Sequence, residues 1–134
     1  MAALELTEVR SRAAAALAPS ADSDPEVLFD YPDSATPPSL ILVWDDPWLE
    51  AETFGPCLFQ ARLAVLCLVA RINPAISQLE AIVGQVIARL AADGNTWPNA
   101  SVQAPRRFDI GGVPLLGARV IYELKVTTNG GGSQ

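Results

Sequence analysis

The densest group of side chains that could carry out chemistry is acidic. Asp45 and Asp46 are adjacent, and Glu50 and Glu52 follow shortly after them. Paired carboxylates can act as general acid and base or hold Mg²⁺. However, adjacent acids beside a proline, here Pro47, are more often simply solvated. The chain also has no histidine, which removes the commonest general base and the commonest zinc ligand. We therefore expect these acids to contribute structure or charge.

Three further motifs are weaker. Asp22–Glu26 alternates acids like a calcium loop but lacks the glycine and the terminal glutamate of an EF-hand. Arg106 and Arg107 precede Phe108 and could stack on nucleic acid, but one basic pair in an acidic protein is more often solvated or at an interface. Gly111–Gly112 lacks the pattern of a phosphate loop and predicts a hairpin turn. We expect no catalytic residue, no cofactor and no metal.

Two cysteines and two apolar runs bear on where the protein is found. Cys57 and Cys67 have apolar neighbours and form no CxxC pair, so we expect reduced thiols in a cytosolic product. The run Ala13–Ala18 is too short for a signal sequence. The run Leu63–Ala70 lies between two arginines and is far shorter than the ~20 residues of a membrane-spanning helix. We expect a soluble protein without membrane contact.

The charge is unevenly distributed along the 134 residues, whose net charge is −6. Residues 1–56 hold eleven acidic and two basic side chains, whereas residues 57–134 hold four acidic and seven basic ones. The stretch Asp22–Glu52 contains no lysine or arginine. Affinity for nucleic acid comes mainly from basic contacts with phosphates. Sequence-specific DNA binding is therefore disfavoured.

Hydrophobic periodicity and the positions of proline and glycine predict the secondary structure. Residues 48–56 are expected to be loop. The expected elements, in chain order, are a helix at 4–17, a short strand at 27–29, strands at 40–44 and 57–71, a helix at 73–90 begun by Asn73 and Pro74 and ended at Asp93–Gly94, a strand at 100–110 interrupted at Pro105, and a strand at 114–126.

The strand at 57–71 carries the clearest pattern. Its odd positions are all apolar, which predicts one face against the core. Its even positions begin with Gln60 and Arg62 and then turn apolar at Leu66 and Leu68, so something must cover that end of the second face. The N-terminal helix and a neighbouring subunit are equally good candidates. If a neighbour covers it, Leu66, Leu68 and Arg62 form the oligomer interface.

The strand at 114–126 alternates apolar and polar residues, which predicts one exposed sheet face. Together the elements predict one domain over residues 1–126, of α+β class, with a mostly antiparallel sheet of about four strands packed with two helices. The glycine-rich residues 127–134 are expected to be disordered.

Three tryptophans, Trp44, Trp48 and Trp97, fall at expected strand ends or in loops beside proline or aspartate. Two interpretations are equally good. They pack over the edge of the core, or they lie in a protein interface, where tryptophan is enriched.

The arrangement resembles the tail terminator proteins of long-tailed bacteriophages. The resemblance rests on the N-terminal helix and on four segments of this sequence, PPSLILVW (37–44), CLFQARLAVLCLVAR (57–71), NPAISQLEAIVGQVIARL (73–90) and GARVIYELKV (117–126). It spans most of residues 4–126, and its motifs carry no catalytic signature to transfer.

The resemblance implies a virion structural protein of the tail or neck, assembled in the host cytoplasm, and not an enzyme. Its subunits would form a homo-oligomeric ring, commonly a hexamer, that caps the finished tail tube and offers the surface for head-tail joining. The implied partners are the major tail tube protein and a connector or stopper protein, while DNA passes through without specific binding. The alternatives are a neighbouring neck component, such as a connector or stopper, and a non-viral adaptor subunit.

Overall fold

The protein is mostly sheet, with two α-helices on one face. The computed structural model describes residues 4–19, 25–28, 37–51, 58–72, 74–94, 96–97 and 100–127. The elements are β1 (Leu4–Glu5), a 3-10 turn η1 (Leu6–Glu8), α1 (Val9–Leu17), β2 (Glu26–Leu28), β3 (Ser39–Ala51), β4 (Leu58–Ala70), α2 (Ala75–Ala91), β5 (Ser101–Val102), β6 (Arg106–Ile110) and β7 (Val113–Thr127).

The expected antiparallel sheet of about four strands is wrong. The described residues form one mixed sheet of 7 strands in the order β1-β7-β4-β3-β2, with β5 and β6 also pairing with β7. The long strand β4 pairs antiparallel with both β3 and β7, whereas β1 pairs parallel with β7 and β2 parallel with β3. The two parallel strands span only 2 and 3 residues, too few to show any periodicity in the sequence.

Three elements begin or end where the sequence did not indicate. The expected helix at 4–17 is a helix only from Val9, because Leu4–Glu5 pairs with the end of β7. The loop expected from residue 48 is strand as far as Ala51. Pro74 is the residue before α2 instead of its first residue, and Asn73 lies outside the described residues, as does the tail after Thr127.

The predicted long strand, second helix and final hairpin are confirmed. Gly111 and Gly112 have φ angles of 60° and 81°, the left-handed values that the turn between β6 and β7 requires and that glycine adopts without strain. The strand expected at 100–110 divides into β5 and β6 on either side of Pro105.

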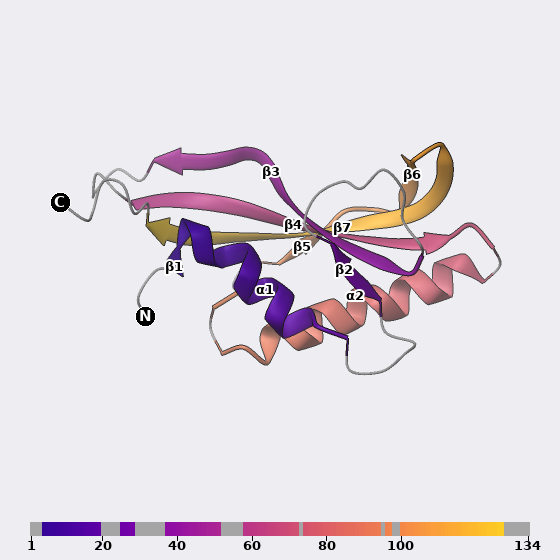
Figure 1. Ribbon diagram of the computed structural model, residues 1–134, viewed down its shortest axis with the longest axis horizontal. Helices are drawn as coiled ribbons and strands as arrows, with labels where there is room; N and C mark the ends of the chain where they lie inside the picture. The colour runs from indigo at the N-terminus through magenta and orange to yellow at the C-terminus, as the bar shows by residue number, and fades with distance from the viewer. Residues whose placement is uncertain are drawn as a thin grey trace.

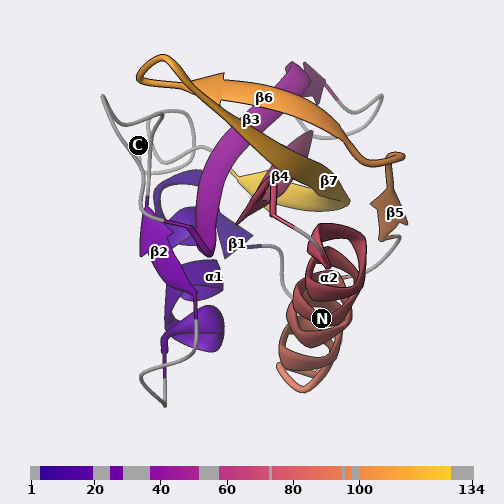
Figure 2. The ribbon, with the colours of Figure 1, turned by 90° about the vertical axis from the view of Figure 1, so that its right-hand side faces the viewer.

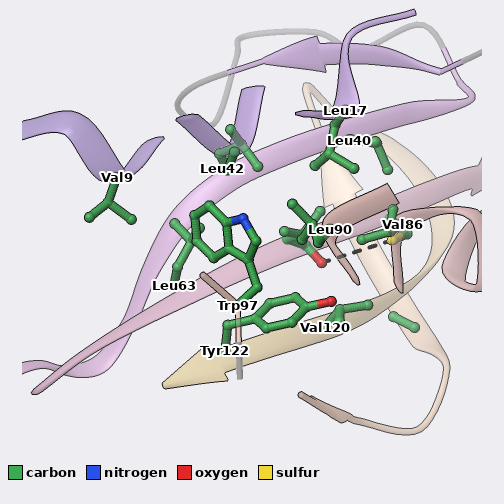
Figure 3. Packing of buried hydrophobic residues seen from close by; sticks show 14 of the residues in the cluster. Val9, Leu17, Leu40, Leu42, Leu63, Val86, Leu90, Trp97, Val120 and Tyr122 are labelled. Carbon is green, nitrogen blue, oxygen red and sulfur yellow. Dashed lines mark hydrogen bonds between the residues drawn. The ribbon is translucent and has the colours of Figure 1, made fainter. Parts of the chain in front are cut away.

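The main core lies between the sheet and the two helices (Figure 1). The odd residues of β4 and the alternate residues of β7 from Ala118 to Val126 point toward α1 and α2, as the sequence predicted. Both helices bury residues at helical spacing, namely Val9, Ala13 and Leu17 in α1 and Leu79, Ile82, Val86 and Leu90 in α2. Figure 3 shows Leu17 of α1 and Val86 and Leu90 of α2 in the same cluster as Trp97 and Tyr122.

A second, smaller cluster covers the other face of the sheet. Ile41 and Val43 of β3, Ala64, Leu66 and Leu68 of β4, and Ile110, Leu115 and Ile121 of β6 and β7 are buried together, with Leu28 and Phe108 packed against them. Figure 2 shows how this is possible, since β6 crosses on the side of the sheet opposite the helices. The expected exposed face of the last strand is therefore wrong where Leu115 and Ile121 are buried on it.

Gly117 allows the hairpin of β6 and β7 to reach the second cluster. A Cβ atom at this position would lie 2.7 Å from Phe108 Cδ2, 2.8 Å from Leu68 Cδ2 and 2.9 Å from the backbone oxygen of Cys67. The backbone oxygen cannot rotate away as a side chain can, so the two strands would have to separate. Glycine is thus required here for the close approach of β4 and β7.

We predict that Gly117→Ala destabilises the fold by about 1–3 kcal/mol, the usual cost of overpacking. The unfolding free energy in urea, followed by circular dichroism, measures the effect. Gly84→Ala in α2 is the matched control, because a Cβ there meets nothing within 4 Å. The control should stabilise the helix by about 0.5–1 kcal/mol. Equal stability of the Gly117 variant and the wild type would contradict the packing assigned to this strand.

Candidate functional site

The acids singled out from the sequence do not form a reactive group. Asp45 accepts a hydrogen bond from Arg119 Nη2 at 2.8 Å, and both side chains are mostly buried, at 14% and 19% exposure. Glu50 is 54% exposed and its carboxylate lies 3.7 Å from Arg62. The side chain of Asp46 and the whole of Glu52 lie outside the described residues. Asp45 thus neutralises a charge beside the second cluster.

Arg62 lies with Glu50 on the sheet face opposite the helices, at the end of that face where the side chains are polar. Its Nε lies 2.7 Å from Glu123 Oε2 on β7, directly across the strand pair. The ion pair lies within one subunit. It therefore engages the Arg62 guanidinium, which the sequence analysis had placed in an oligomer interface. Cross-strand pairs of opposite charge stabilise a sheet modestly.

Leu66 and Leu68 are both 0% exposed. A neighbouring subunit or the N-terminal helix was expected to cover these two leucines. Instead, residues of β3, β6 and β7 of the same chain pack against them. Neither leucine offers a surface to a partner in the folded subunit.

The remaining sequence motifs are also accounted for locally. Arg106 lies over the Phe108 ring, with its Cζ 4.9 Å from the ring centroid, and Arg107 Nε donates to Asp109 Oδ1 at 3.2 Å. Glu26 is exposed in β2, whereas Asp22 and Asp24 lie outside the described residues, as does Cys57. No group of three or more potential metal ligands occurs in the part of the chain that the structure describes.

Cys67 is a free, buried thiol in the main core. Burial raises the pKa of this thiol to about 12, because the apolar surroundings disfavour the thiolate. The thiolate is the reactive form of cysteine. Cys67 therefore packs as a small apolar side chain.

A polar clamp joins the two helices. Asp93, just after α2, accepts hydrogen bonds from Arg12 Nε at 2.9 Å and Arg12 Nη2 at 3.2 Å, and from Trp97 Nε1 at 3.0 Å. In return, Arg89 of α2 donates to the carbonyl oxygen of Ala18 at 2.9 Å, just beyond the end of α1. The hydrogen bonds from Arg12, followed by the one from Trp97, hold the pKa of Asp93 below its usual value.

We predict that the clamp contributes to stability at neutral pH and weakens in acid. Because the pKa of Asp93 is lowered in the folded state, its contribution is complete above the unfolded pKa, about 4, and is lost as the pH falls through the lowered folded value. Asp93→Asn should therefore lose less stability than the wild type between pH 7 and pH 3, as measured by urea unfolding at both pH values. Asp109→Asn, in an exposed pair, is the matched control; an Asp93→Asn pH profile identical to that of the wild type would rule out the clamp's role.

The three tryptophans have different environments. Trp97 is 7% exposed and packs edge-on against Tyr122 at a centroid distance of 6.0 Å. Trp44 is half-buried against the main core. Trp48 stacks on Trp44 at 5.6 Å and remains 48% exposed. Core packing thus accounts for Trp97 and Trp44, and Trp48 is the tryptophan that offers surface.

The most accessible apolar surface lies at the end of the molecule where β4 ends and α2 begins, on the right in Figure 1. An open groove of about 300 Å³ lies here, lined by Arg71, Pro74, Ala75, Ile76, Ser77 and Leu116. Ile76 is 50% exposed in it, and the nearby Ile72 and Val113 are 71% and 52% exposed. Exposed apolar side chains around a depression are typical of an interaction surface.

No sequence motif indicates this groove directly. Ile76 and Ile87 fit the helical repeat of α2 as well as the buried residues do, but they are 50% and 36% exposed. Ile82, on the same helix, is buried instead. A periodic pattern locates an apolar face only to within about one residue's rotation around the helix, or 100°.

Comparison with protein-family models and with curated proteins finds no match for this chain. Among the described helices, none is both long and apolar enough to cross a membrane.

Proposed function

We propose that this chain is a virion structural protein of the tail terminator type. In this role its subunits form a ring, as a hexamer, that caps the end of a phage tail tube and stops the polymerisation of the tube. The outer side of the ring then offers the surface for head-tail joining, with a connector or stopper protein as the next partner. The resemblance of the four sequence segments is the basis for this proposal.

The exposed groove at the start of α2 is the observation that supports it best. Ala75 and Leu116 of its lining also pack against the main core, whereas Ile76 remains 50% exposed and lies in neither described core cluster. A subunit that assembles by rotation needs a surface of this kind and a second, different surface to fill it.

The charge distribution is compatible with a ring around DNA. Of the charged side chains in the described part of β3, Asp45 is neutralised by Arg119, whereas Glu50 is largely exposed. Exposed acids near a channel would repel phosphates and keep DNA from adhering during passage. In this proposal DNA is therefore cargo that passes through and is not bound.

Electron microscopy of the purified protein in negative stain tests the proposal. We expect rings with an axial hole, and we expect added protein to bind the ends of tail tubes and limit their length. Rings that bind a connector or a portal but never a tube end would indicate another neck component. A protein that forms no ring, alone or with tube protein, would contradict the proposal and favour a non-viral adaptor.

A further inference from the structure

The N-terminal segment, residues 4–17, packs on the main core with few buried side chains. It consists of β1, η1 and α1. α1 buries Val9, Ala13 and Leu17, of which Ala13 contributes only a methyl group, and η1 buries no residue. Its neighbour below the sheet in Figure 2, α2, buries four larger side chains, namely Leu79, Ile82, Val86 and Leu90. Because the free energy of burial grows with apolar area, α1 gains less from packing than α2 does.

The N-terminal segment also has little stability of its own. α1 has 9 residues, and an isolated helix shorter than about 12–15 residues is marginal in water. Its N-cap residue, Glu8, makes no side-chain capping hydrogen bond. β1 spans 2 residues and pairs, among the described strands, with β7 alone, at Val126 and Thr127. Once its contacts with the rest of the chain break, we therefore expect the segment to lose its structure as a whole.

Hydrogen bonds at the surface attach this segment to α2. Asp93 accepts from Arg12 Nε at 2.9 Å and from Arg12 Nη2 at 3.2 Å, and Arg89 donates to the carbonyl oxygen of Ala18, just after α1. The Arg12 and Asp93 side chains are 44% and 27% exposed. Water solvates both partners when such a pair separates, so an exposed pair adds only a small free energy to the closed state.

Most of the sheet packs without the N-terminal segment. The second cluster lies on the face opposite the helices and includes no residue of this segment. β4 pairs along its length with β3 and β7, and neither of these ladders involves β1. The loss of residues 4–17 therefore leaves the long strands paired and one of the two clusters complete.

We propose that residues 4–17 open and close as one unit on a domain that stays folded, and that the Arg12–Asp93 pair limits how often they open. Opening removes β1 from β7 at Val126 and Thr127 and exposes the core side chains beneath α1. Proteins commonly open in such contiguous local units, at a lower free energy than global unfolding requires. The subunit can thus change its surface at this end without unfolding, independently of the proposed ring.

Amide hydrogen exchange of the full chain, followed by mass spectrometry, tests the proposal. Amides of α1 should exchange about tenfold faster than those of β4, or more, and their exchange should depend less on added urea, because local opening exposes less surface than global unfolding. Ile41→Val changes a residue that is 0% exposed in the second cluster, and should accelerate exchange in β4 about two- to tenfold. It should leave exchange in α1 unchanged, since Ile41 stays buried while α1 is open.

Arg12→Gln tests the role of the ion pair. Glutamine has a helix propensity similar to that of arginine but cannot pair with Asp93 as a cation, so exchange in α1 should accelerate about two- to fivefold. Arg107→Gln is the matched control, because it removes an exposed pair with Asp109 on β6, away from the helices. The control should leave exchange in α1 unchanged.

Three results would overturn the proposal. Amides of α1 and β4 that exchange at one common rate in the wild type would show that the segment opens only when the whole domain unfolds. Equal acceleration of both elements by Ile41→Val would show the same. Unchanged exchange of α1 in Arg12→Gln would show that the pair with Asp93 does not control the opening.

Discussion

Replacing Leu66 and Leu68 together by alanine is expected to remove most of the stability of the protein. Both side chains are 0% exposed and lie in the cluster between β4 and the hairpin of β6 and β7. A buried leucine replaced by alanine costs about 2–5 kcal/mol, through lost transfer energy and the cavity left behind. Two such changes approach the total unfolding free energy of a small domain, about 5–15 kcal/mol.

Urea unfolding of each single variant and of the double variant measures this loss. The residues are neighbours on one face, so the double effect should differ from the sum of the single effects. Ile72→Ala is the control, since Ile72 is 71% exposed and its loss should change stability little. A double variant that stays folded but no longer self-associates would restore the interface that the sequence pattern suggested.

The sequence pattern located the elements that have many residues on one face. Alternate residues of β4 and β7 are apolar over most of each strand, so the side that packs on the helices follows directly from the period of two. The helical repeat of α2 and the two glycines at residues 111 and 112 fixed the next helix and the final turn in the same way. These signals are local, and long elements repeat them several times.

What covers the second face could not be predicted in this way. On this face Leu66 and Leu68 follow polar residues at the earlier even positions of the strand. The side chains that cover them, Ile110 and Leu115, come more than forty positions later in the sequence. The cover comes from the β6–β7 hairpin, which packs closely on β4 at Gly117, where a Cβ would meet both Phe108 and Leu68. An unassigned apolar face therefore looked like an oligomer interface.

The continuation of β3 past Pro47 has a related cause. In the described residues, β2 pairs with β3 only from Ser39 to Ile41, and beyond that point β3 pairs with β4 alone. Proline is tolerated on edge strands and at bulges, and Pro47 falls between the paired residues Trp44 and Leu49. The register shift between Trp44 and Leu49 absorbs the irregularity. Proline and two aspartates predicted a loop because position at an edge is not visible in sequence.

The candidate site shows the same division between local and distant information. The sequence identified Asp45 as a chemically capable residue, but its partner Arg119 is 74 positions away, and their pairing decides its role. The sequence left open whether Trp48 packs over the edge of the core or lies in an interface. Its exposure could be established only once the strand and its stacking on Trp44 were known.

Replacing Trp97 by alanine is expected to cost about 3–5 kcal/mol, the range for a large aromatic residue in a core. Trp97 is 7% exposed, packs edge-on against Tyr122 of β7, and donates its indole N–H to Asp93 at 3.0 Å. It therefore contacts both the sheet and the clamp that joins α1 to α2. Its removal leaves a cavity and deprives Asp93 of one of its donors.

Trp97→Phe separates these two contributions. Phenylalanine retains an aromatic ring against Tyr122 but cannot donate to Asp93, so this variant should lose only part of the stability, about 1–2 kcal/mol of it from the hydrogen bond to a charged acceptor. Combining it with Asp93→Asn should add less than the sum of the single effects, because both changes remove the same bond. Urea unfolding at pH 7 measures all three variants. Fully additive losses would show that Trp97 stabilises the fold by packing alone and that the clamp consists of Arg12 and Asp93 without it.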